Sequence, residues 1–460
     1  MNLLRPTTFA LFVAIAFVAR AEDAGVSADD IRAILRQRVD VDHNSIGMVV
    51  GIVDPSGEQV VSYGYTDHPG GVEVNGETIY EIGSVTKVFT SLLLQDMIER
   101  GEMKLDDSLA KYLPANVKVP SRGGKEITFH DLITHRSSLP RDVQNLAPTD
   151  PLNPCGNLTT ERMYSFLSGC DLPRDIGAKF EYSNMGVSLV GHAIALKAGQ
   201  DYETLLLERI CRPLKMSDTR LTLGPELQDR VAQAHSRPDF PVPYLQFGDF
   251  PAAGGIHSTV RDLLKFAAAE VGLPNPLAAA ILKTHAIQTG STGPKMAMGW
   301  FVSTEPGREF LWHNGGTIGC HSFVGLDLAK KRGVVVLSNQ WQSIDDIGFH
   351  LLDPQKKLAR VKRPLTRLSG KIDFDACKDY AGRYRLTYPA LDIVVRRDGD
   401  RFLAQPTGFA EFELAPASQT EFFSPEIGVE FTFVKNARGE TDGMVIVEAG
   451  ANVKAAKVEK

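Results

Sequence analysis

The sequence predicts a mixed α/β domain followed by a small all-β domain. Hairpin-like runs of β-branched residues occur near residue 50 and near residue 330, and apolar helical patterns lie between them. Beyond about residue 372 the chain changes to short β-like runs separated by turn residues. We therefore expect an α/β (α+β) fold in which the two ends of the first domain form an antiparallel sheet around a helical insertion, followed by a barrel-like β domain.

Each expected hairpin is marked by its turn. The first runs through residues 47–65 and turns at Asp54-Pro-Ser-Gly57. The second leads from Ser322, turns at residues 330–333 and returns to Ser338. Short runs rich in Val and Ile on both sides of turn residues are typical of antiparallel strand pairs. Both hairpins should belong to the sheet of the first domain.

A long helix is expected directly after Ser84. Gly101 fits its C-terminal end, because glycine is common just beyond the last turn of a helix. Apolar residues recur along it at helical spacing: Val85, Val88, Phe89, Leu92, Leu93, Met97 and Ile98. They cover much of its circumference, and a helix that is apolar on most sides is buried.

The second domain follows a change in composition. Residues 354–364 are basic, bounded by prolines and without clear periodicity, which is typical of a linker. The β-like runs beyond it are residues 391–395, 401–404, 411–414, 430–434 and 444–447. We expect a first domain at residues 22–353, a linker at 354–371 and a β domain at 372–460.

Residues 1–21 have the pattern of a secretory signal peptide. Arg5 precedes an apolar run at residues 9–18, and Ala19-Arg-Ala21 forms a small-x-small cleavage site. A membrane anchor is the alternative, but about a dozen apolar residues are few for a bilayer span. We expect cleavage, no stable membrane span afterwards, and a protein that is periplasmic or secreted.

Composition and charge exclude several classes of function. The proportions of hydrophobic residues (43%) and charged residues (23%) are those of an ordinary globular protein. A formal net charge of −6 argues against a nucleic-acid partner. The sequence has no zinc-type His-Glu-x-x-His motif and no cysteine cluster, so neither a metal nor a cofactor is expected.

The five cysteines suggest one disulfide. Cys155 and Cys170 are the candidate pair, because they would close a short loop rich in Pro, Asn and Gly in an oxidising compartment. Cys320 lies just past a motif described below, but no activating neighbour is evident, so we interpret it as a small buried residue.

Ser84 and Lys87 form the first chemical motif. They are three residues apart at the start of the expected helix, so the hydroxyl and the amine lie on one helical face. The positive end of a helix favours an oxyanion, and a nearby amine can accept the proton of a serine nucleophile. A serine N-cap with a solvated lysine is the alternative for this pair taken alone.

Two further motifs follow it in the chain. Tyr182-Ser-Asn184 comes next, and His313-Asn-Gly-Gly316 comes near the end of the first domain. The three motifs in this order resemble the signature of the serine β-lactamases and penicillin-binding proteins. Tyr-Ser-Asn is similar to the class C β-lactamases, and His-x-Gly to one group of D-alanyl-D-alanine carboxypeptidases. With supporting stretches at residues 105–114, 127–140 and 254–264, the resemblance covers about residues 25–355.

The resemblance implies a fold and a second domain. The fold is the β-lactamase/transpeptidase-like fold, with the site in the cleft between the sheet and the helical region. The β domain looks like the lipocalin-like domain that some members carry at the C-terminus. Its role is open between ligand binding, dimerisation, shaping of the active-site mouth and a purely structural function, and the oligomeric state is open as well.

Catalytic roles follow from what acyl transfer requires. The reaction needs a nucleophile, a base, donors for the oxyanion and an acid for the leaving group. Ser84 is the candidate nucleophile, and Lys87 is the candidate base because it lies within one helical turn. By resemblance Tyr182 is the second proton carrier, and a tyrosine beside a lysine can shift toward phenolate. Asn184 offers both amide polarities to a substrate amide.

The third motif supplies the expected substrate-binding strand. His313, Asn314 and Gly315 are the candidate binding residues, and glycine suits a strand edge that lies against a substrate backbone. By resemblance the oxyanion hole consists of the backbone N–H groups of Ser84 and Gly316. The usual lysine and hydroxyl residue are replaced by His and Asn, and a histidine is only partly cationic at neutral pH, so we expect weaker binding of a substrate carboxylate.

The expected function is that of a periplasmic serine hydrolase with an acyl-enzyme mechanism. Its substrates would be D-alanyl peptides of peptidoglycan, cleaved as a DD-carboxypeptidase or endopeptidase, and it would bind penicillin and other β-lactams. The alternative among enzymes is a class C-like β-lactamase or an esterase/D-amino-acid amidase. From a different class, the alternative is a catalytically silent penicillin-binding sensor.

Overall fold

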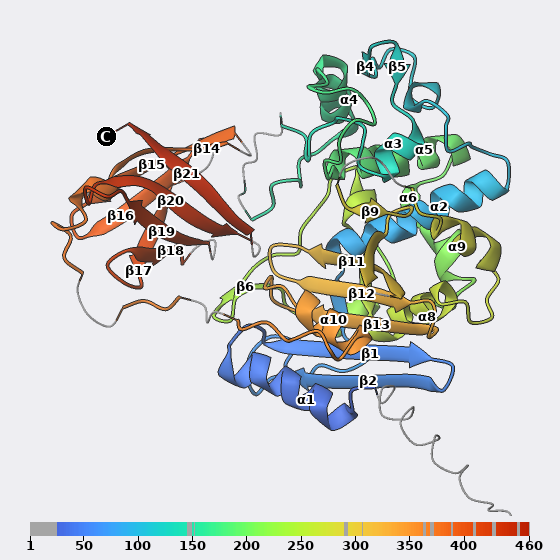
Figure 1. The fold of residues 1–460 in the computed structure, drawn as a ribbon, viewed down its shortest axis with the longest axis horizontal. Coiled ribbons are helices and arrows are strands. Elements are labelled where there is room, and N and C mark those ends of the chain that lie inside the picture. The colour runs from blue at the N-terminus through green and yellow to red at the C-terminus, as the bar shows by residue number, and fades with distance from the viewer. Residues whose placement is uncertain are drawn as a thin grey trace, which may run out of the picture.

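The structure of the protein, a computed structural model, consists of two parts (Figure 1). One part combines a sheet with helices, and the other is a β-barrel. The predicted fold class is confirmed. The predicted signal peptide lies outside the described residues, which are 25–144, 150, 152–288, 293–305, 307–361, 365–368, 372–387, 390–407, 411–425, 429–448 and 451–459.

The sheet of the first part joins the two ends of this domain. Within the described residues it has seven antiparallel strands, in the order β2 (Gly57–Gly64), β1 (Gly47–Asp54), β13 (Arg332–Ser338), β12 (His321–Asp327), β11 (Arg308–Gly316), β10 (Phe301–Glu305) and β9 (Lys295–Met296). Both predicted hairpins are confirmed: β1 pairs with β2, and β12 pairs with β13. The pairing of β1 with β13 closes the sheet between its sequence-distant halves.

Both faces of this sheet are covered, which explains the continuous apolar runs in its central strands. Val334 and Val336 of β13 pack in one cluster with α1 (Ala28–Arg36) and α10 (Asp345–Leu352). Val335 and Leu337 point to the opposite face and pack in the main core, which includes α8 (Val260–Glu270). The alternation of side chains along a strand therefore sorts one apolar run into two layers.

The helical region lies between the two sets of strands in sequence. Its central helix, α2 (Thr86–Glu99), has twelve of its fourteen residues buried, so the predicted buried helix after Ser84 is confirmed. Gly101, in the left-handed region with φ +71°, directly follows its C-cap. The other helices of the region are α3 (Phe129–Ile133), α4 (Thr160–Gly169), α5 (Asn184–Ala198), α6 (Tyr202–Leu206), α7 (Pro225–Gln228) and α9 (Ala278–Thr284).

Three short strand pairs lie outside the main sheet. They are β3 (Ile79–Glu81) with β8 (His257–Thr259), β4 (Ser121–Arg122) with β5 (Lys125–Glu126), and β6 (His235–Arg237) with β7 (Phe240–Pro241). In the first pair Glu81 stands opposite His257. Residues opposite each other in a ladder share one face, so this pair brings Glu81 and His257 to the same side.

The second part is a closed barrel in which each strand pairs with its neighbours in sequence (Figure 1). The first and last strands also pair with each other, which removes the free edges. In the described part of the chain its strands are β14 (Gly382–Thr387), β15 (Ala390–Asp398), β16 (Arg401–Pro406), β17 (Phe412–Pro416), β18 (Glu421–Phe423), β19 (Glu430–Lys435), β20 (Thr441–Glu448) and β21 (Ala451–Glu459).

Aromatic side chains dominate the interior of the barrel. Tyr380 and Phe433 are stacked with their ring centroids 4.1 Å apart. Phe402 and Phe422 pack edge to face at 5.7 Å, and both belong to the same buried cluster. The barrel core is therefore filled by side chains, one of the two arrangements that an eight-stranded barrel allows.

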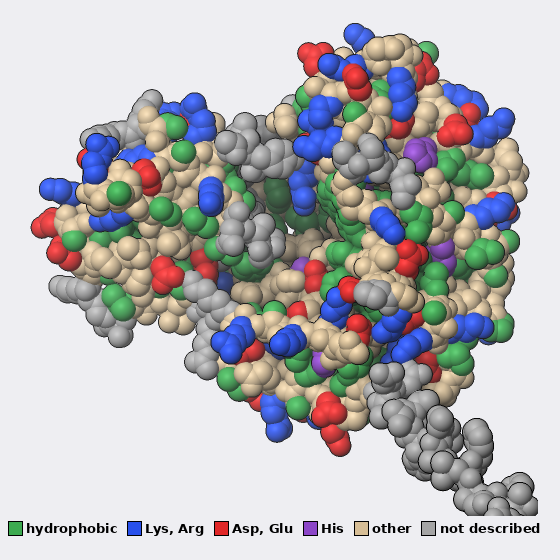
Figure 2. Space-filling model, in the orientation of Figure 1, with side chains coloured by type: hydrophobic (Ala, Val, Ile, Leu, Met, Phe, Trp, Pro, Cys, Tyr) green, Lys and Arg blue, Asp and Glu red, His purple; other side chains and the backbone are tan. Residues whose placement is uncertain are grey.

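Arg237 connects the two parts. This residue of β6 is 5% exposed, and its guanidinium lies 4.2 Å from the ring centroid of Phe423 on β18. The same group donates a hydrogen bond to the carbonyl of Leu365, and its Nη1 is 3.8 Å from a carboxylate oxygen of Glu430 on β19. Elsewhere the surface is hollowed between the barrel and the first domain (Figure 2).

The predicted disulfide is not present. Cys155 and Cys170 are both free among the described residues. Both side chains pack partly buried against the main core, and Cys170 Sγ donates to the carbonyl of Asp171. Cys320 is buried, as expected. Among the described residues, every helix is too short or too polar to cross a membrane.

Candidate active site

Ser84 and Lys87 meet at the entrance to α2. Ser84 lies in the single 3-10 turn Gly83–Val85 that leads into the helix. Lys87 is fully buried, and its Nζ donates to Ser84 Oγ at 2.9 Å and to the carbonyl oxygen of Ala253 at 2.6 Å. The amine is therefore held against the serine by a backbone carbonyl on its other side.

The environment of Lys87 favours the neutral amine. Burial lowers the pKa of Lys87 well below its ordinary value, and the positive charge of Arg141 lowers it further. Asp142 opposes this shift to a smaller extent. A neutral lysine within hydrogen-bond reach of a serine can accept the serine proton.

Tyr182 lies beside Lys87 and Ser84. Lys87 Nζ is 4.9 Å from the Tyr182 ring centroid, and Ser84 is close enough to lower the pKa of the phenol. Burial raises the pKa of Tyr182 to about 12, even though Ser84 and Arg141 act in the opposite direction. The expected shift toward phenolate is therefore wrong for the free protein: Tyr182 carries its proton and can donate it.

Two residues beside Tyr182 were not predicted. The His135 ring lies 4.4 Å from the Tyr182 ring, and its Nδ1 accepts a hydrogen bond from the backbone N–H of Ser183 at 3.1 Å. The Arg141 guanidinium lies 5.2 Å from the same tyrosine ring. His135 belongs to the stretch 127–140 whose resemblance was noted, and Arg141 directly follows it, so this stretch was the available signal.

Asn184 begins α5 beside the same group. Its Nδ2 donates to Asp142 Oδ1 at 2.8 Å, so the carboxylate fixes the orientation of the amide. The N-cap of the helix is Ser183, whose Oγ accepts from the Gly186 N–H at 2.9 Å. Asn184 therefore does not cap the helix, and its role toward a substrate amide stays a prediction.

His313 of β11 faces the tyrosine but is not cationic. Its ring lies 6.4 Å from the Tyr182 ring and 5.2 Å from the Phe301 ring. Burial, followed by the charge of Lys87, lowers the pKa of His313 to about 3. Nδ1 donates to the carbonyl of Asn314 at 2.6 Å, and Nε2 has no partner among the described residues. The expectation of a partly cationic histidine is corrected: the ring is neutral and its free nitrogen is an acceptor.

The side chain of Asn314 is hydrogen-bonded to α10, the helix that follows the sheet. Its Nδ2 donates to Asp345 Oδ2 at 2.6 Å, and the other oxygen of Asp345 lies 3.2 Å from His321 Nε2. Successive residues of a strand point to opposite faces, so Asn314 cannot share the orientation of His313. The Nδ2 group of Asn314 is therefore engaged by α10, and the substrate-binding role of Asn314 stays a prediction.

The two glycines of the third motif permit a close approach. A Cβ on Gly315 would lie 1.9 Å from the carbonyl oxygen of Ile82, which excludes any larger residue. Gly316 is exposed at the end of β11, and a Cβ on Gly83 would meet its backbone N at 2.9 Å. The Gly316 backbone therefore lies beside the turn that carries Ser84, as an oxyanion site formed by these two residues requires.

Glu81 is a further buried group near this strand. The Thr317 hydroxyl donates to its Oε2 at 2.7 Å, and the Leu245 N–H donates to its Oε1 at 2.6 Å. Burial raises the pKa of Glu81 to about 7. Sequence reasoning missed this residue, because a single glutamate in a short strand gives no motif.

Proteins with similar sequences agree with this geometry. A family model described as Beta-lactamase matches residues 31–351. The chain is 32% identical over 220 residues to the D-alanyl-D-alanine-carboxypeptidase/endopeptidase AmpH of Escherichia coli K12, covering 48% of this chain and 56% of that protein. It is 28% identical over 293 residues to Protein flp of Staphylococcus aureus MW2, covering 60% and 56%. The chain thus spans little more than half the length of these relatives.

Solved structures show the same fold for the first domain. A class C β-lactamase from Rhodobacter sphaeroides matches with a TM-score of 0.58 and 24% identity, covering 67% of this chain and 93% of that one. A β-lactamase/D-alanine carboxypeptidase from Yersinia pestis, solved with citrate, matches with a TM-score of 0.59 and 24% identity, covering 68% and 92%.

Proposed function

Because the chain belongs to the Beta-lactamase family and is a serine hydrolase, we propose that Ser84 is its nucleophile and that it cleaves D-alanyl peptides of peptidoglycan. It would act as a DD-carboxypeptidase or endopeptidase and bind penicillin. The observation that carries the catalytic assignment is Lys87, a buried amine held between Ser84 Oγ and the Ala253 carbonyl. The name of the relative AmpH supports the substrate class.

Acylation uses the free-protein protonation states described above. Neutral Lys87 takes the proton of Ser84 while Oγ attacks the substrate carbonyl carbon, and the backbone N–H groups of Ser84 and Gly316 stabilise the oxyanion. The carbon–nitrogen bond then breaks, and the Tyr182 hydroxyl gives its proton to the leaving amine. Lys87 is now an ammonium, and Tyr182 is a phenolate.

Deacylation restores both groups. The Tyr182 phenolate takes a proton from water, and the resulting hydroxide attacks the ester carbonyl of acyl-Ser84. The ester bond breaks, and Ser84 Oγ regains its proton from the Lys87 ammonium. The cycle needs no other base, and it assigns opposite proton movements to Lys87 and Tyr182 in each half.

Covalent labelling tests the nucleophile. Ser84→Ala should lose all labelling by a fluorescent penicillin while its far-UV spectrum and melting temperature stay unchanged. Ser91→Ala is a matched control, because Ser91 lies two turns further along α2 and bonds only the Lys87 carbonyl among the described residues. Intact-mass spectrometry should show one acyl adduct on the parent protein. An adduct on a folded Ser84→Ala protein would refute the assignment.

A β-lactamase, esterase or D-amino-acid amidase is the second candidate. It is favoured by one observation: the neutral His313 places no positive charge in the third motif for a substrate carboxylate. Arg141, over the Tyr182 ring, is the cation of the site that could take this part. The ratio of kcat/KM between a D-alanyl-D-alanine peptide and its C-terminal amide separates the two candidates. A ratio near one, unchanged in Arg141→Gln, would favour the second.

A silent penicillin-binding sensor is separated by turnover. An enzyme releases product and recovers free Ser84, whereas a sensor acylates once and stops. Mixing the protein with a muropeptide pool and following both product release and adduct mass distinguishes these outcomes. Periplasmic location is part of the proposal and rests on the signal-peptide pattern of residues 1–21. N-terminal sequencing of the exported protein tests the cleavage.

A further inference from the structure

The ring of His135 is the nearest of the described rings that contact Tyr182. The two ring centroids are 4.4 Å apart, and the planes are tilted by 31°. The rings of Phe301 and His313 lie farther away, each 6.4 Å from the Tyr182 ring. An aromatic pair at the shorter separation is in direct contact, so His135 limits how far the tyrosine ring can turn.

His135 also binds the chain on both sides of Tyr182. Its backbone carbonyl accepts a hydrogen bond from the N–H of Glu181 at 2.8 Å. Its Nδ1 accepts another from the N–H of Ser183 at 3.1 Å. One residue therefore fixes the two chain neighbours of Tyr182 and packs against the ring between them.

The bond to Ser183 needs a neutral imidazole. Nδ1 accepts a hydrogen bond only when it carries no proton. Burial lowers the pKa of His135 well below its ordinary value, and the charge of Lys87 lowers it further. The proton of the neutral ring is therefore on Nε2, and Nδ1 stays available to Ser183.

The backbone of His135 adopts an uncommon conformation. Its φ is +57°, in the left-handed region that residues other than glycine rarely occupy. Such a residue costs conformational energy, persists only when the surrounding structure holds it, and is most often found at functional sites. Here the residue held in this way is the one that contacts the candidate acid of the proposed mechanism.

From these contacts we infer that His135 is a positioning residue for Tyr182 in acyl transfer. It holds the tyrosine where its hydroxyl can give a proton to the leaving amine, and it acts through Tyr182 rather than on the reacting atoms. The inference rests on the proposed function, in which Tyr182 is the acid. An amide nitrogen must be protonated as it leaves, so a displaced Tyr182 should slow the cleavage of amides more than that of esters whose leaving group is a stable anion.

Two substrates with the same acyl group test this consequence. N-benzoyl-D-alanine p-nitroanilide needs a proton on its leaving nitrogen, whereas the p-nitrophenyl ester releases a stable phenolate. For each substrate kcat/KM of the full-length mature protein is measured by absorbance, because it covers the steps up to acylation and leaves deacylation out. Ser84→Ala gives the background. The readout is the ratio of the anilide value to the ester value, which a general loss of structure would not change.

Tyr182→Phe sets the scale of the effect. It should lower the ratio about a hundredfold, a usual contribution of a general acid. His135→Leu should lower the ratio about thirtyfold, because it removes both the acceptor for Ser183 and the ring contact and so lets the tyrosine move. An unchanged ratio in a folded His135→Leu protein would overturn the inference, even if both rates fall.

His135→Asn serves if His135→Leu fails to fold. Asparagine tolerates the left-handed conformation, and its Oδ1 can accept from the Ser183 N–H in place of Nδ1. It keeps this bond but not the ring, so the ratio should fall by only about fivefold and the variant should partly rescue His135→Leu. Where only His135→Asn folds, a ratio equal to that of the parent protein would overturn the inference.

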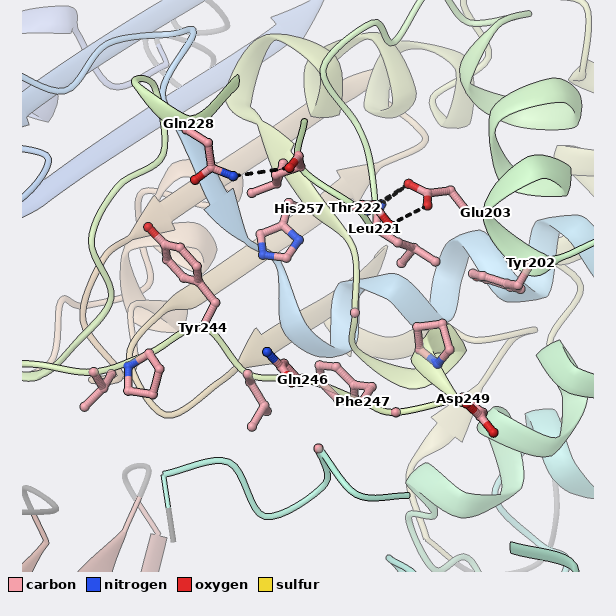
Figure 3. A pocket seen from close by; sticks show the side chains of 18 of the residues that line it. Tyr202, Glu203, Leu221, Thr222, Gln228, Tyr244, Gln246, Phe247, Asp249 and His257 are labelled. Atoms are coloured by element: carbon pink, nitrogen blue, oxygen red, sulfur yellow. Dashed lines mark hydrogen bonds between the residues drawn. The ribbon is translucent and has the colours of Figure 1, made fainter. Parts of the chain in front are cut away.

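His257→Leu is the matched control. His257 is a second buried histidine, 8% exposed, and burial lowers its pKa to about 4. Its ring lies beside Tyr244 at the wall of a cavity of about 950 Å³ (Figure 3). Neither Ser84, Lys87 nor Tyr182 lines this cavity. The control removes a buried imidazole without removing a neighbour of Tyr182, so the ratio should stay that of the parent protein. A fall as large as in His135→Leu would overturn the inference.

Fluorine NMR separates the position of Tyr182 from its chemical role. In protein labelled with 3-fluorotyrosine, the Tyr182 signal is the one that is missing from Tyr182→Phe. It should broaden or split in His135→Leu, because the ring then takes more than one position, and it should stay a single sharp line in His257→Leu. A single sharp line in both His135→Leu and His135→Asn would overturn the inference.

Failure of the proposed function gives a different result. Equal losses of anilide and ester cleavage in Tyr182→Phe would refute the acid role of Tyr182. The fluorine signal needs no turnover, so it still decides whether His135 holds the tyrosine ring in place.

Discussion

The first domain buries a lysine and several histidines between its sheet and its helices, whereas the barrel closes around aromatic rings. Lys87, His135 and His313 are each at most 1% exposed. In the barrel, Tyr380 and Phe433 stack in the centre of a buried apolar cluster. Burying polar groups costs stability unless they are bonded or neutralised, and burial lowers the pKa of all three residues toward the neutral form.

The contrast indicates where each domain can act. The first domain keeps reactive groups dry, which strengthens the electrostatic interactions on which acyl transfer depends. Side chains fill the interior of the barrel. Ligand binding along the barrel axis is therefore less favoured than the other three roles that the sequence left open, which are dimerisation, shaping of the active-site mouth and a purely structural function. A structural role, or an effect on the mouth of the cleft through the Arg237 contact, fits the filled interior better.

The largest expected effect is the loss of acylation rate on removing the side chain of Lys87. Lys87→Ala should slow acylation by about a thousandfold or more, because it removes the base from a cooperating pair. In the parent protein the rate should rise with pH through the lowered pKa of Lys87, since only the neutral amine accepts a proton, and then level off. Stopped-flow labelling across pH measures both. Lys197→Ala, at an exposed lysine in the last turn of α5, is the control.

A substitution in the barrel core should lower stability without changing the rate of acylation. Phe433→Ala should destabilise the barrel by about 3 to 5 kcal/mol, the usual cost of removing a buried aromatic ring. The acylation rate of the folded protein should stay the same. Thr432→Ala, at the neighbouring and less buried position of β19, controls for the strand. Calorimetry and labelling at a temperature below the transition check the pair, and a large loss of acylation would mean that the barrel shapes the site.

Glu81 should make the first domain sensitive to pH. Its pKa, raised to about 7 by burial, lies above that of an unfolded glutamate near 4.5, so the folded state binds the proton more tightly. Its contribution is therefore fully present below about pH 4.5 and is lost as pH rises through 7, a change on the order of 3 kcal/mol. Glu81→Gln should flatten the stability profile between pH 5 and 7.5 in urea denaturation. Exposed Glu58→Gln should leave the slope intact.

The smallest expected effect concerns the contact between the domains. Arg237→Ala removes a buried guanidinium from Phe423 and from the carbonyl of Leu365, and should cost about 2 kcal/mol. Asp239→Asn, at the exposed partner of the same arginine, should cost almost nothing. Two-transition calorimetry shows whether the loss falls on the barrel. A shift of both transitions together would show that the domains unfold as one unit.

Sequence patterns identified the strands that are rich in β-branched residues and the helix whose apolar residues recur at helical spacing. The hairpin of β1 and β2 and the buried helix α2 follow directly from Val-rich runs, turn residues and helical spacing. Three barrel strands escaped: β14, β18 and β21. Strand β18 has three residues, and β21 is rich in Ala and Lys, which are poor strand formers, so pairing with neighbours rather than propensity fixes them.

The candidate site was predictable only as far as its motifs. Ser84, Lys87 and Tyr182 come together as expected, but the charge of His313 and the partner of Asn314 depend on burial and on α10, which a linear motif does not contain. Arg141 lowers the pKa of Lys87, and Glu81 accepts a hydrogen bond from Thr317, although the two residues of each pair are far apart in the chain. No spacing rule reports such neighbours, so the electrostatics of the site could not be read from the sequence.

The pairing of β1 with β13 has a consequence for how this domain is made. The strand near its start cannot find its partner until almost the whole domain has left the ribosome, and contacts so distant in sequence form slowly. The proposed oxyanion site has a similar delay, because Gly316 of β11 lies beside the turn that carries Ser84 but is made more than 200 residues later. A half-made chain can therefore contain Ser84 and Lys87 without the second oxyanion donor. On the proposed mechanism, efficient acylation begins only once β11 is in place.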